Sequence, residues 1–160
     1  MQQEFIDTIA IHQPIILKVC RMYCTEKDDR EDLFQEIVLQ LWRSYPSFKG
    51  EAKISTWMYR ISINTAITSL RKNSRKPVTQ ALSAEHENIN EITEQRIDVE
   101  YARELQLAIN ILSKIDKALV MLYLEEKSYK EIAEILGISE SNVGVKINRI
   151  KKKLQELIKP

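Results

Sequence analysis

The chain has 160 residues, a formal net charge of +1 and only 3 glycines and 4 prolines. With many Ile, Leu, Lys, Glu and Ala residues, this composition predicts an all-α fold and excludes a turn-rich β fold, which needs a break about every 8–12 residues. No apolar stretch reaches the ~18 residues of a membrane span and the N-terminus lacks a signal-peptide pattern, so we expect a cytoplasmic protein without membrane insertion.

Both cysteines, Cys20 and Cys24, lie in the first apolar stretch, one helical turn apart. Without a secretory signal they are predicted to be reduced, buried thiols and not a disulfide. The alternative, a metal site, has little support because His12 and His86 have no ligand-like spacing to this pair. We therefore expect no metal and no cofactor.

Between residues 32 and 43 the apolar residues repeat at i, i+1, i+4, i+5, i+8 and i+9, which predicts a helix with one core-facing side. These residues are Leu33, Phe34, Ile37, Val38, Leu41 and Trp42. The other side of the helix is polar and carries Asp32, Gln35, Glu36 and Gln40.

The next segment, residues 44–56, contains Pro46 and Gly50 and is predicted to be a loop. Ser55 or Thr56 can cap the helix that follows it. That helix runs into a basic stretch and is expected to end near residues 74–76, because Pro77 cannot continue a helix and disfavours helical dihedrals in the residue before it.

Residues 77–97 are polar and acidic and have no sustained apolar face, so they are predicted to form a linker. The chain then divides into two small helical domains, residues 1–76 and 101–160, joined by a flexible acidic linker over residues 77–100. Each domain is small for an independent core, so mutual packing or a large partner is expected to stabilise both.

In the second domain, Leu105, Ile109, Leu112 and Ile115 are predicted to share one helix face, and residues 118–124 form an apolar run expected to be buried.

A short helix, a turn and a longer helix follow. Ser128 and Glu131 have capping-box spacing, Gly137 suits a left-handed turn, and Ser139 can cap the last helix. The predicted core positions of that helix keep a spacing of 3–4 residues: Val143, Ile147, Ile150, Leu154 and Leu157. This pattern predicts a DNA-binding helix-turn-helix. The alternative is an αα-hairpin with a solvated basic helix.

A recognition helix presents its N-terminal, outward residues to base edges in the major groove. Because Val143 and Ile147 are predicted to face the core, five residues fall on the outward side of the helix: Ser141, Asn142, Val145, Lys146 and Arg149. Amide, lysine and guanidinium groups can bond base edges, and valine can contact a thymine methyl group. Lys151, Lys152 and Lys153 are expected to hold the DNA backbone.

The small net charge conceals three charged blocks. Residues 60–76 carry +5, residues 80–100 carry −5 and residues 141–160 carry +5. Two basic surfaces joined by an acidic connector favour one polyanion bound at two places, although charge runs can also solvate a helix face. The first basic block follows a loop that mixes aromatic and cationic residues, as capture of unstacked bases requires. Trp57, which follows this loop, fits a core position equally well.

These segments resemble the extracytoplasmic-function group of the sigma-70 family of RNA polymerase sigma factors. DLFQEIVLQLW, residues 32–42, resembles region 2.2 of that family. FKGEAKISTWMYRISINTAI, residues 48–67, resembles regions 2.3 and 2.4, and SYKEIAEILGISESNVGVKINRIKKKL, residues 128–154, resembles region 4.2. The three motifs occur in the family's order and with its gap between them.

The resemblance implies a role for each surface. It implies core RNA polymerase (β′ clamp helices and β flap), promoter DNA and an anti-sigma factor as partners, with Asp32, Gln35, Glu36 and Gln40 on the polymerase. The −10 element would contact Phe48, Lys49, Lys53, Trp57, Arg60, Asn64, Arg71, Lys72 and Arg75. The −35 element would contact Ser141, Asn142, Val145, Lys146, Arg149, Lys152 and Lys153. Together these roles would direct promoter-specific initiation and help open the DNA.

One residue departs from the family pattern. The family usually has a basic residue soon after the valine at position 143, where this chain has Gly144. Glycine costs about 1 kcal/mol relative to alanine inside a helix, so it indicates either close backbone approach to DNA or a different −35 preference.

Two other functions fit parts of the sequence. A stand-alone helix-turn-helix regulator would need a sensor or phosphoacceptor domain upstream, and residues 1–76 are few and helical for that purpose. A nuclease or recombinase could use Asp32 and Glu36, which lie four residues apart, but no histidine or third acid joins them. We therefore expect no enzymatic activity.

Overall fold

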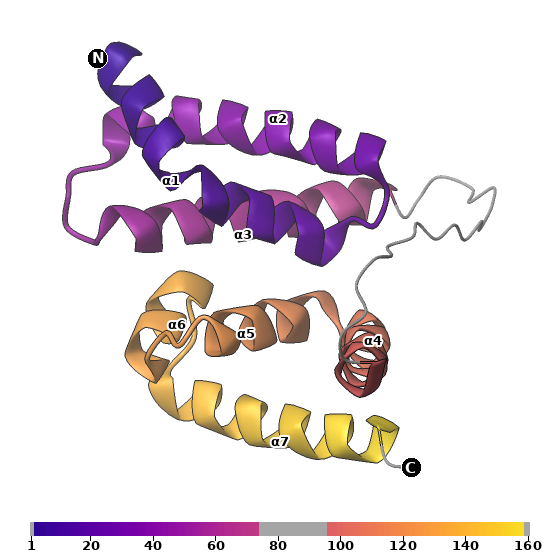
Figure 1. The fold of residues 1–160 in the computed structure, drawn as a ribbon. Helices are drawn as coiled ribbons and strands as arrows, with labels where there is room; N and C mark the ends of the chain where they lie inside the picture. The colour runs from indigo at the N-terminus through magenta and orange to yellow at the C-terminus, as the bar shows by residue number, and fades with distance from the viewer. Residues whose placement is uncertain (1, 74–95, 159–160) are drawn as a thin grey trace.

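The computed structural model of the chain describes residues 2–73 and 96–158, and the regular elements of these ranges are all helices (Figure 1). The N-terminal layer contains α1 (Gln2–Tyr23), α2 (Lys27–Ser44), the 3₁₀ turn η1 (Tyr45–Ser47) and α3 (Ile54–Asn73). The C-terminal layer contains α4 (Arg96–Ile111), α5 (Lys114–Leu124), α6 (Tyr129–Leu136) and α7 (Glu140–Ile158). The all-α prediction is confirmed. No described helix is both long and apolar enough to cross a membrane.

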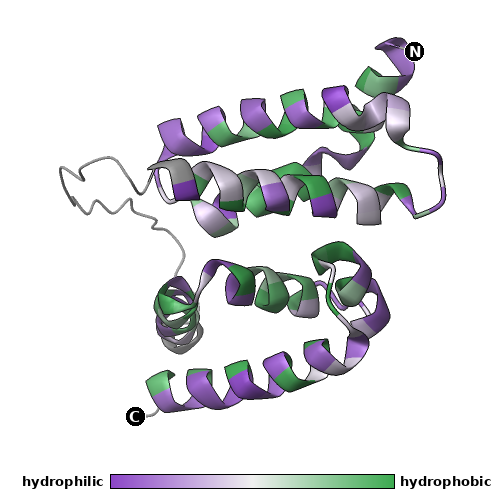
Figure 2. Cartoon of the chain, turned by 180° about the vertical axis from the view of Figure 1, so that it is seen from behind, coloured by the Kyte–Doolittle hydropathy of each residue, from purple (hydrophilic) through white to green (hydrophobic). Residues whose placement is uncertain are grey.

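Helix α2 follows the predicted stripe. Leu33, Ile37 and Leu41 are buried against α1 and α3, and its outward side is hydrophilic (Figure 2). Trp42 differs from the prediction because it stays 41% exposed. It lies near the end of the helix, where its ring packs edge-on against Phe5 with 5.0 Å between the ring centroids.

Helix α1, for which no prediction was made, runs through Pro14. Proline removes a backbone donor and clashes with the preceding turn. Close to this proline His12 adopts non-helical dihedrals (φ −104°, ψ 17°), so the helix bends and continues. Cys20 and Cys24 are buried, unpaired thiols, as predicted, and burial raises the pKa of Cys20 to about 11.

Helix α3 begins at Ile54, ahead of both predicted caps, so the expectation that Ser55 or Thr56 caps it is wrong. Thr56 is buried instead, and with the next three residues it forms an uninterrupted buried run that ends at Tyr59. Four consecutive buried residues point to different sides of a helix, so α3 is covered on more than one side. Its described part ends at Asn73.

The start of the C-terminal layer also differs from the prediction. Helix α4 begins at Arg96, so the last five residues of the predicted linker are helical, while residues 77–95 lie outside the described residues. Leu112 and Ile115 do not extend α4, because Ser113 accepts a hydrogen bond from Asp116 N at 3.2 Å and starts α5. The apolar run of α5 is buried only as far as Leu122.

The helix-turn-helix forms as its caps predict. Ser128 and Glu131 make a reciprocal capping box, with hydrogen bonds of 2.9 and 3.1 Å. Gly137 ends α6 at φ 74°, and Ser139 accepts from Asn142 N at 3.1 Å at the start of α7. Val143, Ile147 and Ile150 are buried, whereas Leu157, predicted as a core residue, is 45% exposed in the final turns.

The two layers are in contact. Helix α3 packs on α6 and α1 packs on α5, and the buried residues of both layers belong to one continuous core. The expected mutual support of the two small domains is therefore present in this structure.

Two glycines of the helix-turn-helix should respond oppositely to alanine. Gly137→Ala places a Cβ in the left-handed region and should destabilise the protein by about 1 kcal/mol. Gly144→Ala should stabilise it by up to about 1 kcal/mol, because the added Cβ meets the Tyr129 ring at an ordinary 3.5 Å. Urea unfolding of both variants measures the two effects, and each serves as the control for the other. Stability changes in the same direction for both variants would contradict the different conformations of Gly137 and Gly144.

Candidate nucleic-acid and partner interface

Helix α7 exposes a polar and cationic face beside its buried stripe. Ser141, Val145, Arg149 and Lys152 are exposed at spacings of four, four and three residues and therefore share one face of the helix. Asn142 and Lys153 are exposed beside that face and Lys146 is half-buried there. All seven residues predicted to contact the −35 element thus lie on one helix, outside its core stripe.

Gly144 lies on one flank of this face. Among the described side chains, the atoms that a Cβ at Gly144 would meet belong to Tyr129, at 3.5 and 3.9 Å. Tyr129 is the first residue of α6 and is 38% exposed. The ring of Tyr129 thus lies beside the recognition helix at the position of Gly144.

Two helical turns further along the same flank, Lys151 lies over Tyr123, with its Nζ 4.8 Å from the ring centroid. The Tyr123 hydroxyl group raises the pKa of Lys151, and Tyr129 adds to this effect. Tyr123 and Tyr129 thus border the candidate DNA face. Neither tyrosine was predicted at this face, because nothing in the local sequence around them links them to α7.

The aromatic residues of the loop before α3 pack on one another. Trp57 is only 7% exposed, and its ring lies 4.8 Å from Phe48 and 6.1 Å from Tyr45. Tyr45 in turn contacts Phe5 of α1, with 5.2 Å between the ring centroids. Of the two roles open to Trp57 in the sequence, this packing favours the core role. Phe48 remains half-buried at the surface.

The polar and cationic residues predicted to contact the −10 element are distributed along the loop and α3. Lys49, Lys53, Asn64 and Arg71 are exposed and Arg60 is half-buried. The Lys72 side chain and all of Arg75 lie outside the described residues. Lys53 and Arg60 point toward α6: Lys53 Nζ lies 3.4 Å from Glu131 Oε2, and Arg60 donates to the Glu134 carbonyl.

A groove between α2 and α3 collects most of the residues predicted to bind polymerase. Asp32, Glu36 and Gln40 line it from α2, and Asn64 lines it from α3. The Gln40 side chain donates to Glu36 Oε2 at 3.0 Å, which orients both. Gln35 is exposed outside the groove. The described residues hold no group of three or more His, Cys, Asp or Glu that could bind a metal ion.

Comparison with known proteins shows the family to which the chain belongs. Residues 8–76 match the model of sigma-70 region 2, and residues 102–154 match that of sigma-70 region 4. The ECF RNA polymerase sigma-E factor of Haemophilus influenzae is 29% identical over 145 residues, covering 84% of this chain and 77% of that protein. The chain belongs to the extracytoplasmic-function group of the sigma-70 family.

Other similar proteins match almost the whole length of this chain. The ECF RNA polymerase sigma factor SigW of Bacillus subtilis is 29% identical, with 98% of this chain and 91% of that protein covered. The solved structure of the sigma factor RpoE with the anti-sigma factor NepR from Bartonella quintana shares the fold, with a TM-score of 0.74 at 20% identity and 98% of both chains covered. CnrH in complex with the cytosolic domain of CnrY gives a TM-score of 0.69 at 19% identity, with 99% of this chain and 89% of that chain covered.

The family match decides between the alternatives of the sequence analysis. Region 2 occupies the part of the chain where a stand-alone regulator would need its sensor, so that alternative is not favoured. The chain is an RNA polymerase sigma factor.

The burial of Trp57 can be tested by substitution. Trp57→Ala should lower the free energy of unfolding by about 3–5 kcal/mol, because it empties a packed aromatic site. Trp42→Ala is the matched control and should cost less, since Trp42 is 41% exposed. Urea unfolding followed by circular dichroism measures both. Equal stability of Trp57→Ala and the native chain would show that Trp57 is not a core residue.

Proposed function

We propose that this sigma factor binds core RNA polymerase and directs initiation at promoters whose −35 and −10 elements it contacts with separate surfaces. Helix α7 reads the −35 element in the major groove, and the loop over residues 48–53 together with α3 holds the −10 strand and helps open the duplex. The factor itself catalyses no reaction and acts in the cytoplasm. It would comprise residues 1–76 as region 2, a linker over residues 77–100 and residues 101–160 as region 4.

The face of α7 is the observation that carries this proposal. A capped helix-turn-helix exposes amide, hydroxyl, lysine and guanidinium groups along the first three turns of its second helix, where a major-groove reader needs them. The lysines further along the helix supply backbone contacts that fix its position on the duplex.

The negative charge of the groove between α2 and α3 favours a protein partner over a nucleic acid. Asp29, Asp32 and Glu36 line it, and these carboxylates would repel phosphate groups. A basic protein surface complements them, and charge complementarity of this kind speeds and orients association. We assign this groove, with Gln35 at its edge, to the β′ clamp helices of the polymerase.

The C-terminal layer has an apolar groove between α4 and α7, lined by residues that include Tyr101, Leu107, Ile111 and Leu157. These four side chains are between 45% and 63% exposed. A patch of this kind marks a protein contact more often than ordinary surface does, and we assign it to the β flap. An anti-sigma factor is a further proposed partner, since RpoE, which shares the fold, is bound to the anti-sigma factor NepR in its solved structure.

Run-off transcription with core polymerase from the source organism tests the function. The purified chain should be sufficient for a specific transcript from a cognate promoter. A transcript that appears only when another sigma factor is added would contradict the proposal.

The polymerase groove predicts the effect of charge reversal. Asp32→Arg combined with Glu36→Arg should abolish co-purification with core enzyme while circular dichroism and thermal unfolding show an intact fold, because the groove would then repel a basic partner. Glu31→Arg is the matched control, since Glu31 is exposed on the same helix but does not line the groove. Undiminished binding by the double variant would remove the groove from the polymerase interface.

The recognition helix predicts two kinds of DNA defect. Lys146→Ala and Arg149→Ala should weaken −35 binding by the holoenzyme, and at least one should change base preference by about 1–3 kcal/mol. Lys153→Ala should weaken binding to all sequences alike and reduce the salt slope by about 1, as removal of a phosphate-binding lysine does. Affinities for native and substituted promoters separate the two patterns. If neither Lys146→Ala nor Arg149→Ala changed base preference, the two residues would not take part in base readout.

A further inference from the structure

Asn148 is exposed on the outward face of α7, although it was not among the residues predicted to contact the −35 element. It follows Val145 by three residues and precedes Lys152 by four, so the three side chains share one face of the helix. Within the described part of the chain, no group forms a hydrogen bond with the Asn148 amide. Asn148 therefore offers a donor and an acceptor on the face that the proposed function places in the major groove.

Gly144 lies one helical turn before Asn148 and carries no side chain on this surface. Side chains of an α-helix lean toward its N-terminus, so Asn148 leans toward Gly144. The described atoms within 4 Å of a Cβ at Gly144 belong to Tyr129, at 3.5 and 3.9 Å, and none belongs to Asn148. On the side of Asn148, the helix backbone at Gly144 is therefore not covered by another described side chain.

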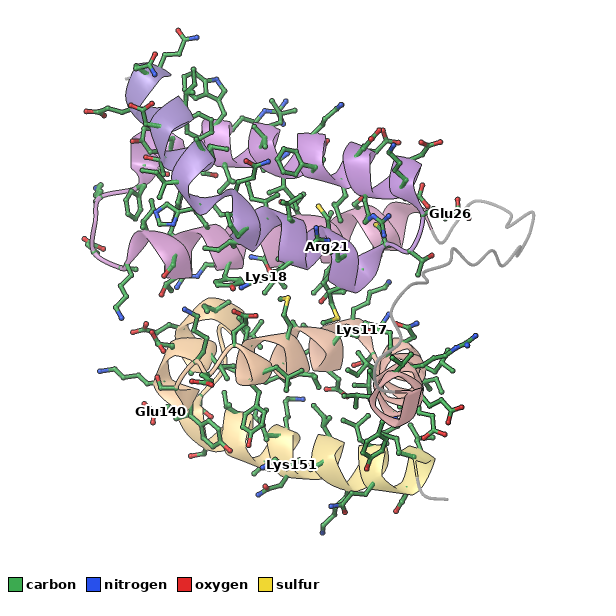
Figure 3. The ribbon with its side chains drawn as sticks, viewed as in Figure 1. Lys18, Arg21, Glu26, Lys117, Glu140 and Lys151 are labelled. Atoms are coloured by element: carbon green, nitrogen blue, oxygen red, sulfur yellow. The ribbon has the colours of Figure 1, made fainter. Side chains whose placement is uncertain are left out.

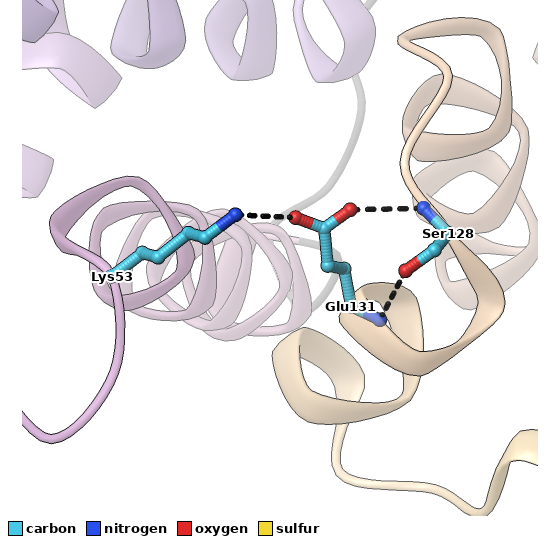
Figure 4. A network of polar contacts seen from close by, with 3 residues as sticks. All are labelled: Lys53, Ser128 and Glu131. Carbon is cyan, nitrogen blue, oxygen red and sulfur yellow. Dashed lines mark hydrogen bonds and ion pairs between the residues drawn. The ribbon is translucent and has the colours of Figure 1, made fainter.

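The capping box that starts α6 fixes the backbone that carries the Tyr129 ring. The Ser128 N–H donates to Glu131 Oε1 at 2.9 Å, and the Glu131 N–H donates to Ser128 Oγ at 3.1 Å (Figure 4). Tyr129 lies between these two residues and is the first residue of α6. The ring thus borders Gly144 from a well-defined position.

The next cation along this flank of α7 is engaged by α5. Lys151 lies three residues after Asn148, and its Nζ is 4.8 Å from the centroid of the Tyr123 ring. This contact directs the long side chain of Lys151 toward α5 and not over Asn148. Gly144 and Asn148 lie on the stretch of α7 between Glu140 and Lys151 (Figure 3).

We propose that Asn148 reads an adenine of the −35 element, and that the bare backbone of Gly144 lets the base edge come close enough for this contact. The inference deepens the proposed function and rests on it, because it requires α7 to lie in the major groove. Asn148 would be a further base-reading residue, and Gly144 would be a positioning residue.

The chemistry of the amide selects adenine. A carboxamide has an NH₂ donor and a carbonyl acceptor, and adenine presents the matching pair in the major groove, its N7 acceptor and its N6 donor. Guanine presents two acceptors there, so it can satisfy only the donor of the amide. Because the asparagine side chain is short, both hydrogen bonds require the helix to approach the base closely, which a residue without a Cβ permits.

Base substitution in the promoter tests the contact. Native holoenzyme, formed from the full-length chain and core polymerase, first selects its −35 sequence from duplexes randomised over that region. The selected duplex is then substituted one base pair at a time. Asn148→Ala should lower the preference for adenine at one base pair by about 5- to 150-fold, the range of one bidentate contact. Asn110→Ala is the matched control, since Asn110 is an exposed asparagine of α4.

A modified base tests the hydrogen bond itself. 7-Deazaadenine at the same base pair removes the N7 acceptor and keeps the pairing with thymine. It should weaken binding by the native holoenzyme and leave binding by the Asn148→Ala holoenzyme unchanged. Asn142→Ala should act at a different base pair, because Asn142 lies six residues earlier on α7.

The outcomes separate the inference from the proposed function. If the native and Asn148→Ala holoenzymes responded equally to every base and to 7-deazaadenine, the inference alone would be overturned. A native holoenzyme without any −35 preference would contradict the proposed function as well.

The role of Gly144 is tested by a change that should stabilise the protein. Gly144→Ala adds one methyl group, which meets the Tyr129 ring at an ordinary 3.5 Å. The same variant should lose part of the adenine preference at the Asn148 base pair, because the methyl group holds the helix away from the base edge. A residue with a structural role alone would not combine higher stability with weaker readout. Full adenine preference in Gly144→Ala would overturn the close approach that the proposal requires.

Discussion

The whole arrangement depends on helix α3, which is covered on two sides. Its residues Trp57, Met58 and Tyr59 are buried in succession, with α1 and α2 on one side and α6 on the other. A helix covered in this way needs apolar residues around most of its circumference, so few positions remain for polar function. Asn64 and Arg71 occupy such positions, and Arg60 lies at the border where α6 begins to cover the helix.

Because so much of α3 is buried, packing and binding in the N-terminal layer use different side chains. The aromatic rings of Tyr45, Phe48 and Trp57 stabilise the loop before α3 by contacting one another, and aromatic pairs contribute about 0.5–1.5 kcal/mol beyond the area that they bury. Trp57 is only 7% exposed, so its ring is not free to stack on a base. Strand capture is thus left to half-buried Phe48 and to the cations, with Trp57 as the support beneath them.

The sequence predicted the helix-turn-helix well because its signals are local. A Ser–Glu capping box, a left-handed glycine and a Ser cap each act within four residues, and all three formed as expected. Two predictions were wrong: Ile54 starts α3 before either candidate cap, and Ser113 caps a new helix within the predicted apolar stripe. The contacts of Gly144 with Tyr129 and of Arg60 with Glu134 join residues 15 and 74 positions apart, and no local pattern encodes them.

The contact between the layers combines two forces with different responses to solvent. The shared apolar core holds the layers together at any ionic strength, whereas the Lys18–Glu125 and Lys53–Glu131 ion pairs add charge contacts that salt weakens. A purely ionic contact would be too weak to order two small domains, so the apolar core carries most of the contact.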